Sequence, residues 1–284
     1  MADYPELLQA HQFALIDQAA LIPQDWHEGL PLLPLETTAL KASPGTLPAL
    51  LPLGPDMPYM GSLLQNLELA EDDPSLLTPC ALLATAPDTE PESLQRHLAE
   101  CLVPYVGIHS RAYLRYFDPT VFPRLARIIP PNRLSFLYGP VYTWTIPFQK
   151  EWIRFHEPNP ERRSSVWVLS AEQWEQIELI RFINRALEQY ESYLGHPWNS
   201  FKEYDKAAET AERAMLLAQS LYGIKEKEDL QAFAEDSLFH GEHFHRHPYI
   251  ENLLKNLPPE GYGAASAEIT ETIWAEAEKL ARNY

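Results

Sequence analysis

Hydrophobic periodicity divides the chain into two parts of different character. Up to residue 169, apolar residues occur in short runs separated by prolines and polar turns. From Ser170 onward they recur every three or four residues, the spacing of amphipathic helices. The pattern predicts an α+β protein, with an N-terminal mixed α/β lobe over residues 1–169 and an all-helical C-terminal lobe over residues 170–284.

The first hundred residues predict alternating strands and helices. Residues 22–60 are rich in proline and leucine without clear periodicity, which favours short strands between turns. Apolar positions at helical spacing make residues 91–101 an amphipathic helix. The other predicted elements are a strand or first helical turn at Phe13–Leu21, a short helix at Leu63–Leu69 and a buried strand at Cys80–Ala86.

The central stretch YLRYFDPTVFPRLARIIPPNRLSFLYGPVYTWTIPF, residues 113–148, is rich in aromatic residues. Aromatic side chains at Tyr113–Phe117 predict a strand. Asp118-Pro119 ends it, because Asp is a good helix N-cap and proline suits the first helical position. The elements predicted next are a short helix over Thr120–Ile129 and strands at Leu134–Tyr138 and Val141–Ile146, joined at Gly139-Pro140, with edge strands at Trp152–Phe155 and Val166–Leu169.

Capping residues set the helix limits in the C-terminal part. Ser170 with Gln173 and Ser200 with Glu203 have the spacing of capping boxes. Gly195 is placed to end the first of these helices. Further helices are predicted over Lys227–His240, Pro248–Leu257 and Ser266–Arg282.

Composition narrows the class of protein. Hydrophobic residues make up 45% of the 284 residues, enough for a real core. No apolar run approaches the roughly 18 residues of a membrane span, and the start of the chain lacks the features of a signal peptide. Cys80 and Cys101 build no disulfide framework. We therefore expect a cytoplasmic protein without membrane insertion, and the net charge of −18 argues against nucleic acid as partner.

The charge is unevenly distributed. Residues 101–163 contain nine basic and four acidic residues, whereas both flanking parts are acidic. This basic belt either neutralises the acidic parts within the fold or forms a docking surface for an acidic partner. Arg124 and Arg127 lie three apart on the predicted helix after Asp118, so an exposed pair would be a candidate partner-binding patch.

Histidines crowd the segment HGEHFHRHP, at His240, His243, His245 and His247. Histidine is a common metal ligand, but this spacing lacks the H-E-x-x-H pattern, and a helix C-terminus also favours histidine. No nucleophile elbow, P-loop or dinucleotide fingerprint occurs. We therefore expect no catalytic residues, no cofactor and no metal site, with helix-end capping or a partner contact as the roles of these histidines.

Large apolar residues flank Gly241, where regular helix packing should lapse. The partner-binding candidates here are Phe239, Phe244, Tyr249 and Ile250, because aromatic residues exposed at such a break mark interaction sites. The alternative is that they seal the two lobes together.

The segments LRYFDPTVFPRL and FLYGPVYTW resemble the core signature of the type VI secretion effector-adaptor family. Residues 13–21 and 93–102 are similar to the family's opening segment and to the helix before the signature, and residues 229–254 to its helical tail. The chain departs from the pattern at His109-Ser110-Arg111. The matching signature residues are Arg115, Tyr116, Phe117, Asp118, Pro119, Gly139, Pro140 and Trp144.

The resemblance implies a bacterial adaptor-chaperone that is not an enzyme. Such a protein holds a toxic effector in the cytoplasm and loads it onto the VgrG spike protein. The signature residues would then be mainly structural, with Arg115 holding the fold. Two alternatives remain open at this point: a metal-dependent hydrolase that uses the His240–His247 cluster, and an interaction subunit of another assembly.

Overall fold

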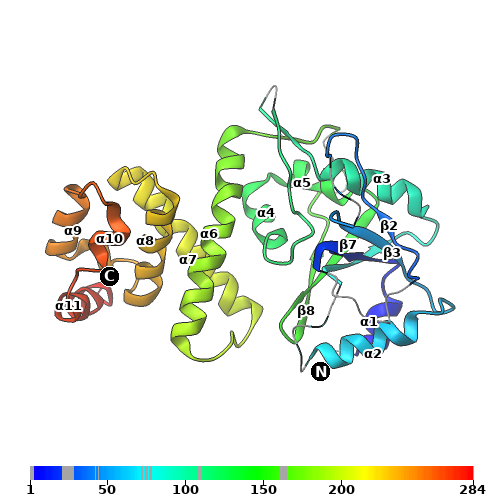
Figure 1. Cartoon of the computed structure of the whole chain (residues 1–284), viewed down its shortest axis with the longest axis horizontal. Helices are drawn as coiled ribbons and strands as arrows, with labels where there is room; N and C mark the ends of the chain where they lie inside the picture. The colour runs from blue at the N-terminus through cyan, green and yellow to red at the C-terminus, as the bar shows by residue number, and fades with distance from the viewer. Residues whose placement is uncertain are drawn as a thin grey trace. The chain divides into compact units, whose positions relative to one another are not determined.

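The computed structural model describes residues 3–283 except 21–28, 42, 44, 72, 74–75, 77–78, 108–109, 160 and 162–164. The protein is α+β, as predicted: strands and helices alternate in the N-terminal part, and residues 171–281 are helical (Figure 1). Internal contacts divide the chain into unit 1, residues 1–177, and unit 2, residues 178–284. This division falls inside helix α6 (Ala171–Leu194), whereas the sequence pattern placed the boundary at the start of that helix.

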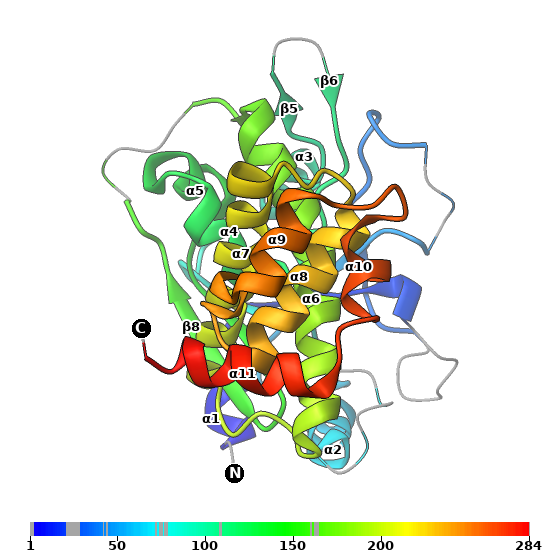
Figure 2. The same cartoon turned by 90° about the vertical axis from the view of Figure 1, so that its left-hand side faces the viewer.

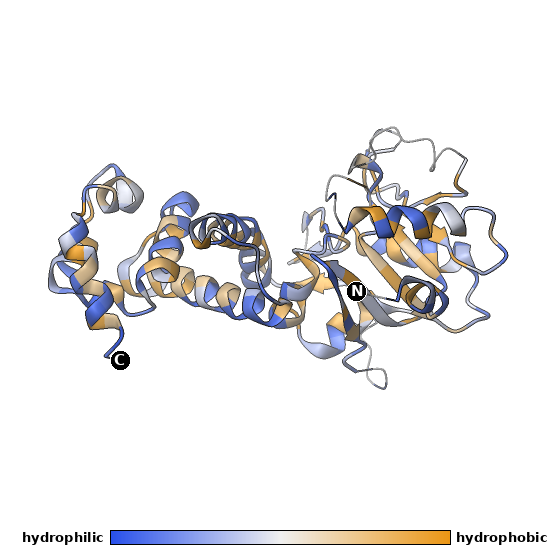
Figure 3. Ribbon diagram, turned by 90° about the horizontal axis from the view of Figure 1, so that it is seen from below, coloured by the Kyte–Doolittle hydropathy of each residue, from blue (hydrophilic) through white to orange (hydrophobic). Residues whose placement is uncertain are grey.

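Unit 1 is built on a six-stranded sheet in which every neighbouring pair is antiparallel. In spatial order its strands are β2 (Leu33–Pro34), β3 (Ala49–Pro52), β1 (Phe13–Ile16), β4 (Ala81–Thr85), β7 (Val141–Phe148) and β8 (Glu151–His156). All residues of β1 and β4 are buried, because both faces of the sheet are covered. The colouring of Figure 3 shows this, since the inner strands are mostly apolar.

One face of the sheet packs against α1 (Tyr4–Gln9) and α2 (Met60–Ala70). Leucines of both helices form one apolar cluster with alternate residues of the strands, such as Ile16 and Leu82. A buried polar link crosses this layer: the ring of His11 lies between the carbonyl of Leu7 and the hydroxyl of Thr145, each at 2.7 Å. Both ring nitrogens of His11 are thus hydrogen-bonded, and these bonds connect the end of α1 to β7.

The other face packs against α3 (Pro91–Cys101), α4 (Phe122–Ile128) and α5 (Pro131–Tyr138). Its centre is Trp144 of β7, whose ring stacks on Phe122 at 4.7 Å and contacts Tyr138 edge-on. A second, three-stranded sheet adjoins the end of α3 and contains β6 (Ser110–Arg111), β5 (Tyr105–Val106) and β9 (Val168–Leu169).

Two strand predictions in the central stretch were wrong. Tyr113–Phe117 forms an irregular segment that turns at Arg115, where the amide of Asp118 donates to the Arg115 carbonyl at 3.0 Å. Leu134–Tyr138 belongs to helix α5, which begins at Pro131. The buried residues Leu134, Leu137 and Tyr138 follow helical spacing, and this pattern outweighs the strand propensity of the aromatic residues.

Unit 2 consists of helices (Figure 2). After α6 come α7 (Phe201–Tyr222), α8 (Lys227–His240), the short 3-10 helix η3 (Phe244–Arg246), α9 (Pro248–Lys255), α10 (Gly261–Ser266) and α11 (Glu271–Ala281). Helix α8 is central, because it packs against α7, α10, α11 and η3. Buried alanines on α7, including Ala211 and Ala218, allow the close approach of α8.

The predicted caps of unit 2 and of the start of α6 are confirmed. The Ser170 hydroxyl accepts from the Gln173 amide, and the Gln173 side chain accepts from the Ser170 amide. The Ser200 hydroxyl accepts from the Glu203 amide at the start of α7, while the Glu203 carboxylate accepts from the amide of Asn199, one residue earlier than the capping box predicts. Gly195 adopts a left-handed φ of 71° after α6. The predicted helix Ser266–Arg282 is in fact two helices, since α10 ends at Ser266 and α11 begins at Glu271. In the described part of the chain, no helix combines the length and apolarity needed to cross a membrane.

Candidate functional site

The aromatic signature residues lie in the core of unit 1. Tyr116 and Trp144 are fully buried and Phe117 almost so. The Tyr116 hydroxyl donates to the carbonyl of Leu98 at 2.7 Å, which ties the turn after Leu114 to α3. These residues therefore hold helices to the sheet and present no chemistry at the surface.

Asp118 organises the turn before α4. The prediction that it is the N-cap of that helix was wrong. Helix α4 begins at Phe122 with Val121 at the cap position. The Asp118 carboxylate instead accepts from the amide and hydroxyl of Thr120, at 2.9 and 2.8 Å, and Pro119 lies within this turn. Asp118 therefore stabilises the turn that precedes α4, and its role is structural, as it would have been for an N-cap.

The Gly139-Pro140 pair forms the corner between α5 and β7. Gly139 has a φ of 53°, a conformation that side chains disfavour. A Cβ atom built there would lie 2.3 Å from Nε2 of His97 on α3. Glycine is therefore required both by the backbone and by the close approach of α3.

The proposed basic pair Arg124 and Arg127 is not an exposed patch. Arg124 is 1% exposed, and Arg127 is half-buried. Both lie on α4, but Arg124 is on the face that packs into unit 1. The prediction failed because an arginine stem packs well among apolar residues, so spacing alone does not identify the solvent face.

The histidines of the 240–247 segment do not converge on a common point. Nδ1 of His240 pairs with Glu278 at 2.9 Å, and its ring stacks on Trp274 at 4.1 Å. His247 approaches Glu276, and His245 bonds to Tyr222. Among the described residues, no three His, Cys, Asp or Glu side chains are grouped as metal ligands. The rings of His240 and His247 contact α11, whereas His245 contacts α7.

Neither cysteine is an activated nucleophile. Burial raises the pKa of the Cys80 thiol to about 12, and burial raises the pKa of Cys101 well above its ordinary value. Both thiols are therefore protonated near neutral pH, and it is the thiolate that reacts.

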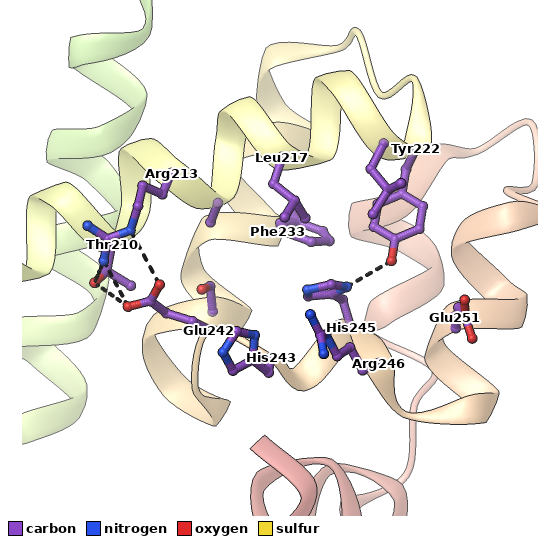
Figure 4. A pocket seen from close by; sticks show the side chains of 13 residues that line it. Thr210, Arg213, Leu217, Tyr222, Phe233, Glu242, His243, His245, Arg246 and Glu251 are labelled. Carbon is purple, nitrogen blue, oxygen red and sulfur yellow. Dashed lines mark hydrogen bonds and ion pairs between the residues drawn. The ribbon is translucent and has the colours of Figure 1, made fainter. Parts of the chain in front are cut away.

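A hollow in unit 2 has a volume of about 540 Å³ and lies between α7, α8, η3 and the start of α9 (Figure 4). We call it the α7–α9 hollow. Its apolar wall includes Leu217, Tyr222 and Phe233. Charged side chains of both signs stand at its two ends, with Arg213 and Glu242 at one and Arg246 and Glu251 at the other.

The Arg213–Glu242 pair is held in place by several bonds. Nη2 of Arg213 lies 2.8 Å from a carboxylate oxygen of Glu242, and Nε lies 3.3 Å from the other oxygen. The Thr210 hydroxyl donates to the same carboxylate. The Arg213 side chain lowers the pKa of Glu242, so both partners are charged at neutral pH.

His245 is a buried polar residue in the wall of the hollow. Burial lowers its pKa to about 4, and the nearby guanidinium of Arg246 acts in the same direction. The imidazole is therefore neutral. Burial raises the pKa of Tyr222, whose hydroxyl lies within hydrogen-bond distance, 2.8 Å, of Nδ1 of His245. This hydrogen bond joins α7 to η3 at the wall of the hollow (Figure 4).

The four apolar candidates around Gly241 have different positions. Phe244 and Ile250 are fully buried, so they belong to the core of unit 2 and are not partner-binding surfaces. Tyr249 is 49% exposed, and Phe239 is half-buried against Tyr190 and Tyr193. None of the four lines the α7–α9 hollow. Sequence reasoning missed the α7 residues that do, because their spacing is that of any amphipathic helix.

Searches against protein-family models, curated proteins and solved structures found no match to this chain.

Proposed function

We propose that the protein is an adaptor-chaperone of the type VI secretion kind that its central signature resembles. In this proposal it binds a toxic effector in the bacterial cytoplasm and delivers it to the VgrG spike. It acts through protein contacts, without a cofactor or a reaction of its own.

The observation that carries the proposal is the chemistry of the α7–α9 hollow. An apolar wall, a neutral imidazole and charges of both signs suit a polypeptide segment, which offers apolar side chains and backbone groups together. The charges of Arg213 and Glu242 are already paired, so they need little reorganisation when a partner binds.

The positions of the signature residues support the same proposal. Tyr116, Phe117 and Trp144 stabilise unit 1 from within, and Gly139 shapes a corner. A family pattern made of such residues preserves a scaffold, as expected for a protein whose partners are bound elsewhere on its surface.

The test is capture of partners from the native bacterium. The tagged full-length chain is purified under mild conditions, and bound proteins are identified by mass spectrometry. We expect a VgrG spike protein and one effector. Recovery of subunits of a different assembly would assign the protein to that assembly instead.

A matched pair of variants connects the capture to the hollow. Leu217 lines the hollow, whereas the adjacent Leu216 is 37% exposed and does not. Leu217→Gln should reduce capture of one partner, and Leu216→Gln should leave it unchanged. Equal capture by the two variants would contradict the role of the hollow.

A further inference from the structure

A second surface of unit 2 is formed by three aromatic rings, Tyr190 and Tyr193 of α6 and Phe239 of α8. We call it the Tyr193 patch. The rings of Tyr190 and Tyr193 are stacked with centroids 6.3 Å apart, and Phe239 lies 5.0 Å from Tyr193 and 5.7 Å from Tyr190. Tyr193 is 69% exposed, so a large aromatic face points to solvent.

The patch rests on a buried aromatic base. Tyr190 contacts Trp198 at 5.8 Å, and Trp198 meets Tyr204 edge-on at 5.7 Å. Trp198 and Tyr204 are both more than nine-tenths buried. The exposed rings are therefore held in position before any partner arrives, which lowers the entropic cost of binding.

Unit 2, which carries the patch, is negatively charged. Residues 178–284 contain 19 acidic and 11 basic residues, a net charge of −8. The charge of Glu203 contributes to raising the pKa of Tyr190, after burial and Tyr193, so this carboxylate acts directly on the patch. The Glu203 carboxylate accepts hydrogen bonds from the amide and side chain of Asn199, which are neutral groups.

Other aromatic faces of the protein already carry an arginine of the same chain. Arg111 lies over the ring of Tyr105 at 4.2 Å, and Arg115 over Phe117 at 5.1 Å. Within the described ranges, no arginine or lysine is placed over Tyr190, Tyr193 or Phe239. The Tyr193 patch thus exposes an aromatic ring face of the kind that arginine covers at Tyr105 and Phe117, but here no arginine of the described residues covers it.

We propose that the Tyr193 patch binds an arginine- or lysine-containing segment of a protein partner. A cation seated on the exposed face of Tyr193 gains cation–π attraction, and the negative field of unit 2 draws a basic segment towards it. The inference rests on the proposed function in one respect, that the ligand is a protein.

The probe is a dye-labelled peptide of alternating arginine and glycine, and its binding to the full-length chain is followed by fluorescence anisotropy. We expect saturable binding that weakens as salt is raised. A peptide of alternating glutamate and glycine should not bind. Failure of the arginine peptide to bind, or equal binding of the glutamate peptide, would overturn the proposal.

Three variants assign the binding to the patch. Tyr193→Ala should weaken it about two- to fivefold, the value of an exposed cation–π contact, and Tyr193→Phe should retain it. Tyr105→Ala is the matched control, since Tyr105 is 42% exposed but its face is covered by Arg111. Unchanged binding by Tyr193→Ala would refute the assignment. If the peptide binds but neither a spike protein nor an effector is captured, the role of the Tyr193 patch is supported and the adaptor proposal is contradicted.

Discussion

Nη2 of Arg115 lies 3.3 Å from a carboxylate oxygen of Asp17, which is 98 residues earlier in the chain. The same guanidinium reaches Asp118 at 3.6 Å and lies over the ring of Phe117. One half-exposed side chain thus joins the end of β1 to the turn that precedes α4. These contacts are consistent with the fold-holding role that the resemblance implies for Arg115, although its exposure keeps the contribution of each ion pair to stability small.

Asp118→Ala should destabilise unit 1 without removing a reactive group. The substitution deletes two hydrogen bonds to Thr120, and we expect a loss of about 1 kcal/mol in the free energy of unfolding. Urea unfolding followed by circular dichroism measures it. Asp118→Asn retains an acceptor and should lose less. Wild-type stability combined with lost partner binding would make Asp118 a contact residue instead.

Gly139→Ala should cost more than Gly195→Ala, although both glycines have a left-handed φ. At Gly195 nothing lies within 4 Å of an added Cβ, so only backbone strain of about 1 kcal/mol is expected. At Gly139 the His97 ring must also move, and we expect about 1–3 kcal/mol more. Thermal melting of the two variants compares them directly, and equal losses would show that His97 shifts freely.

Asp236→Asn should stabilise the protein above neutral pH. Burial raises the pKa of Asp236 to about 7 from 3.8, and Tyr262 donates to its carboxylate at 2.6 Å. The folded state thus binds a proton more tightly than the unfolded state. The associated stabilisation is complete below pH 3.8 and is lost as pH rises from there to about 7.

The measurement is the melting temperature of both proteins from pH 4 to pH 8. Asparagine is neutral throughout and still accepts from Tyr262, so the variant should melt several degrees higher at pH 8. The difference should shrink towards pH 4. If the variant is less stable at pH 8, the hydrogen bond from Tyr262 to the ionised carboxylate stabilises the fold by more than the burial of the charge destabilises it.

Removal of metal should leave the protein unchanged, because His240, His245 and His247 bond to three different side chains. After dialysis against a chelator, we expect the melting temperature and partner capture to match those of the untreated protein. Elemental analysis of protein whose affinity tag has been cleaved provides the check. One zinc per chain that disappears on His243→Ala would instead support the metal-dependent alternative.

His240→Ala provides the matching stability test. It removes the stack on Trp274 and the contact with Glu278, both of which fasten α11 to α8. We expect a loss of about 1 kcal/mol in the free energy of unfolding and no change in metal content. A loss of metal with unchanged stability would reverse the assignment.

The sequence by itself determined those features that depend on local chemistry. The predicted limits of Pro91–Cys101 and Lys227–His240 match α3 and α8. Proline begins α3, and a glycine with positive φ follows α8. The Ser170 and Ser200 caps were equally visible, because a cap and its amide lie within one turn of each other. The α+β division follows from the same local periodicities.

Tertiary structure alone decided which side chains are available to a partner. Arg124 and Phe244 were both candidates for the surface and are both buried, because the faces of α4 and η3 are set by distant elements. The α7–α9 hollow and the Tyr193 patch each combine residues from helices that are separated in sequence. Short-range periodicity shows that a helix has an apolar face, but packing determines what covers that face and which rings remain exposed.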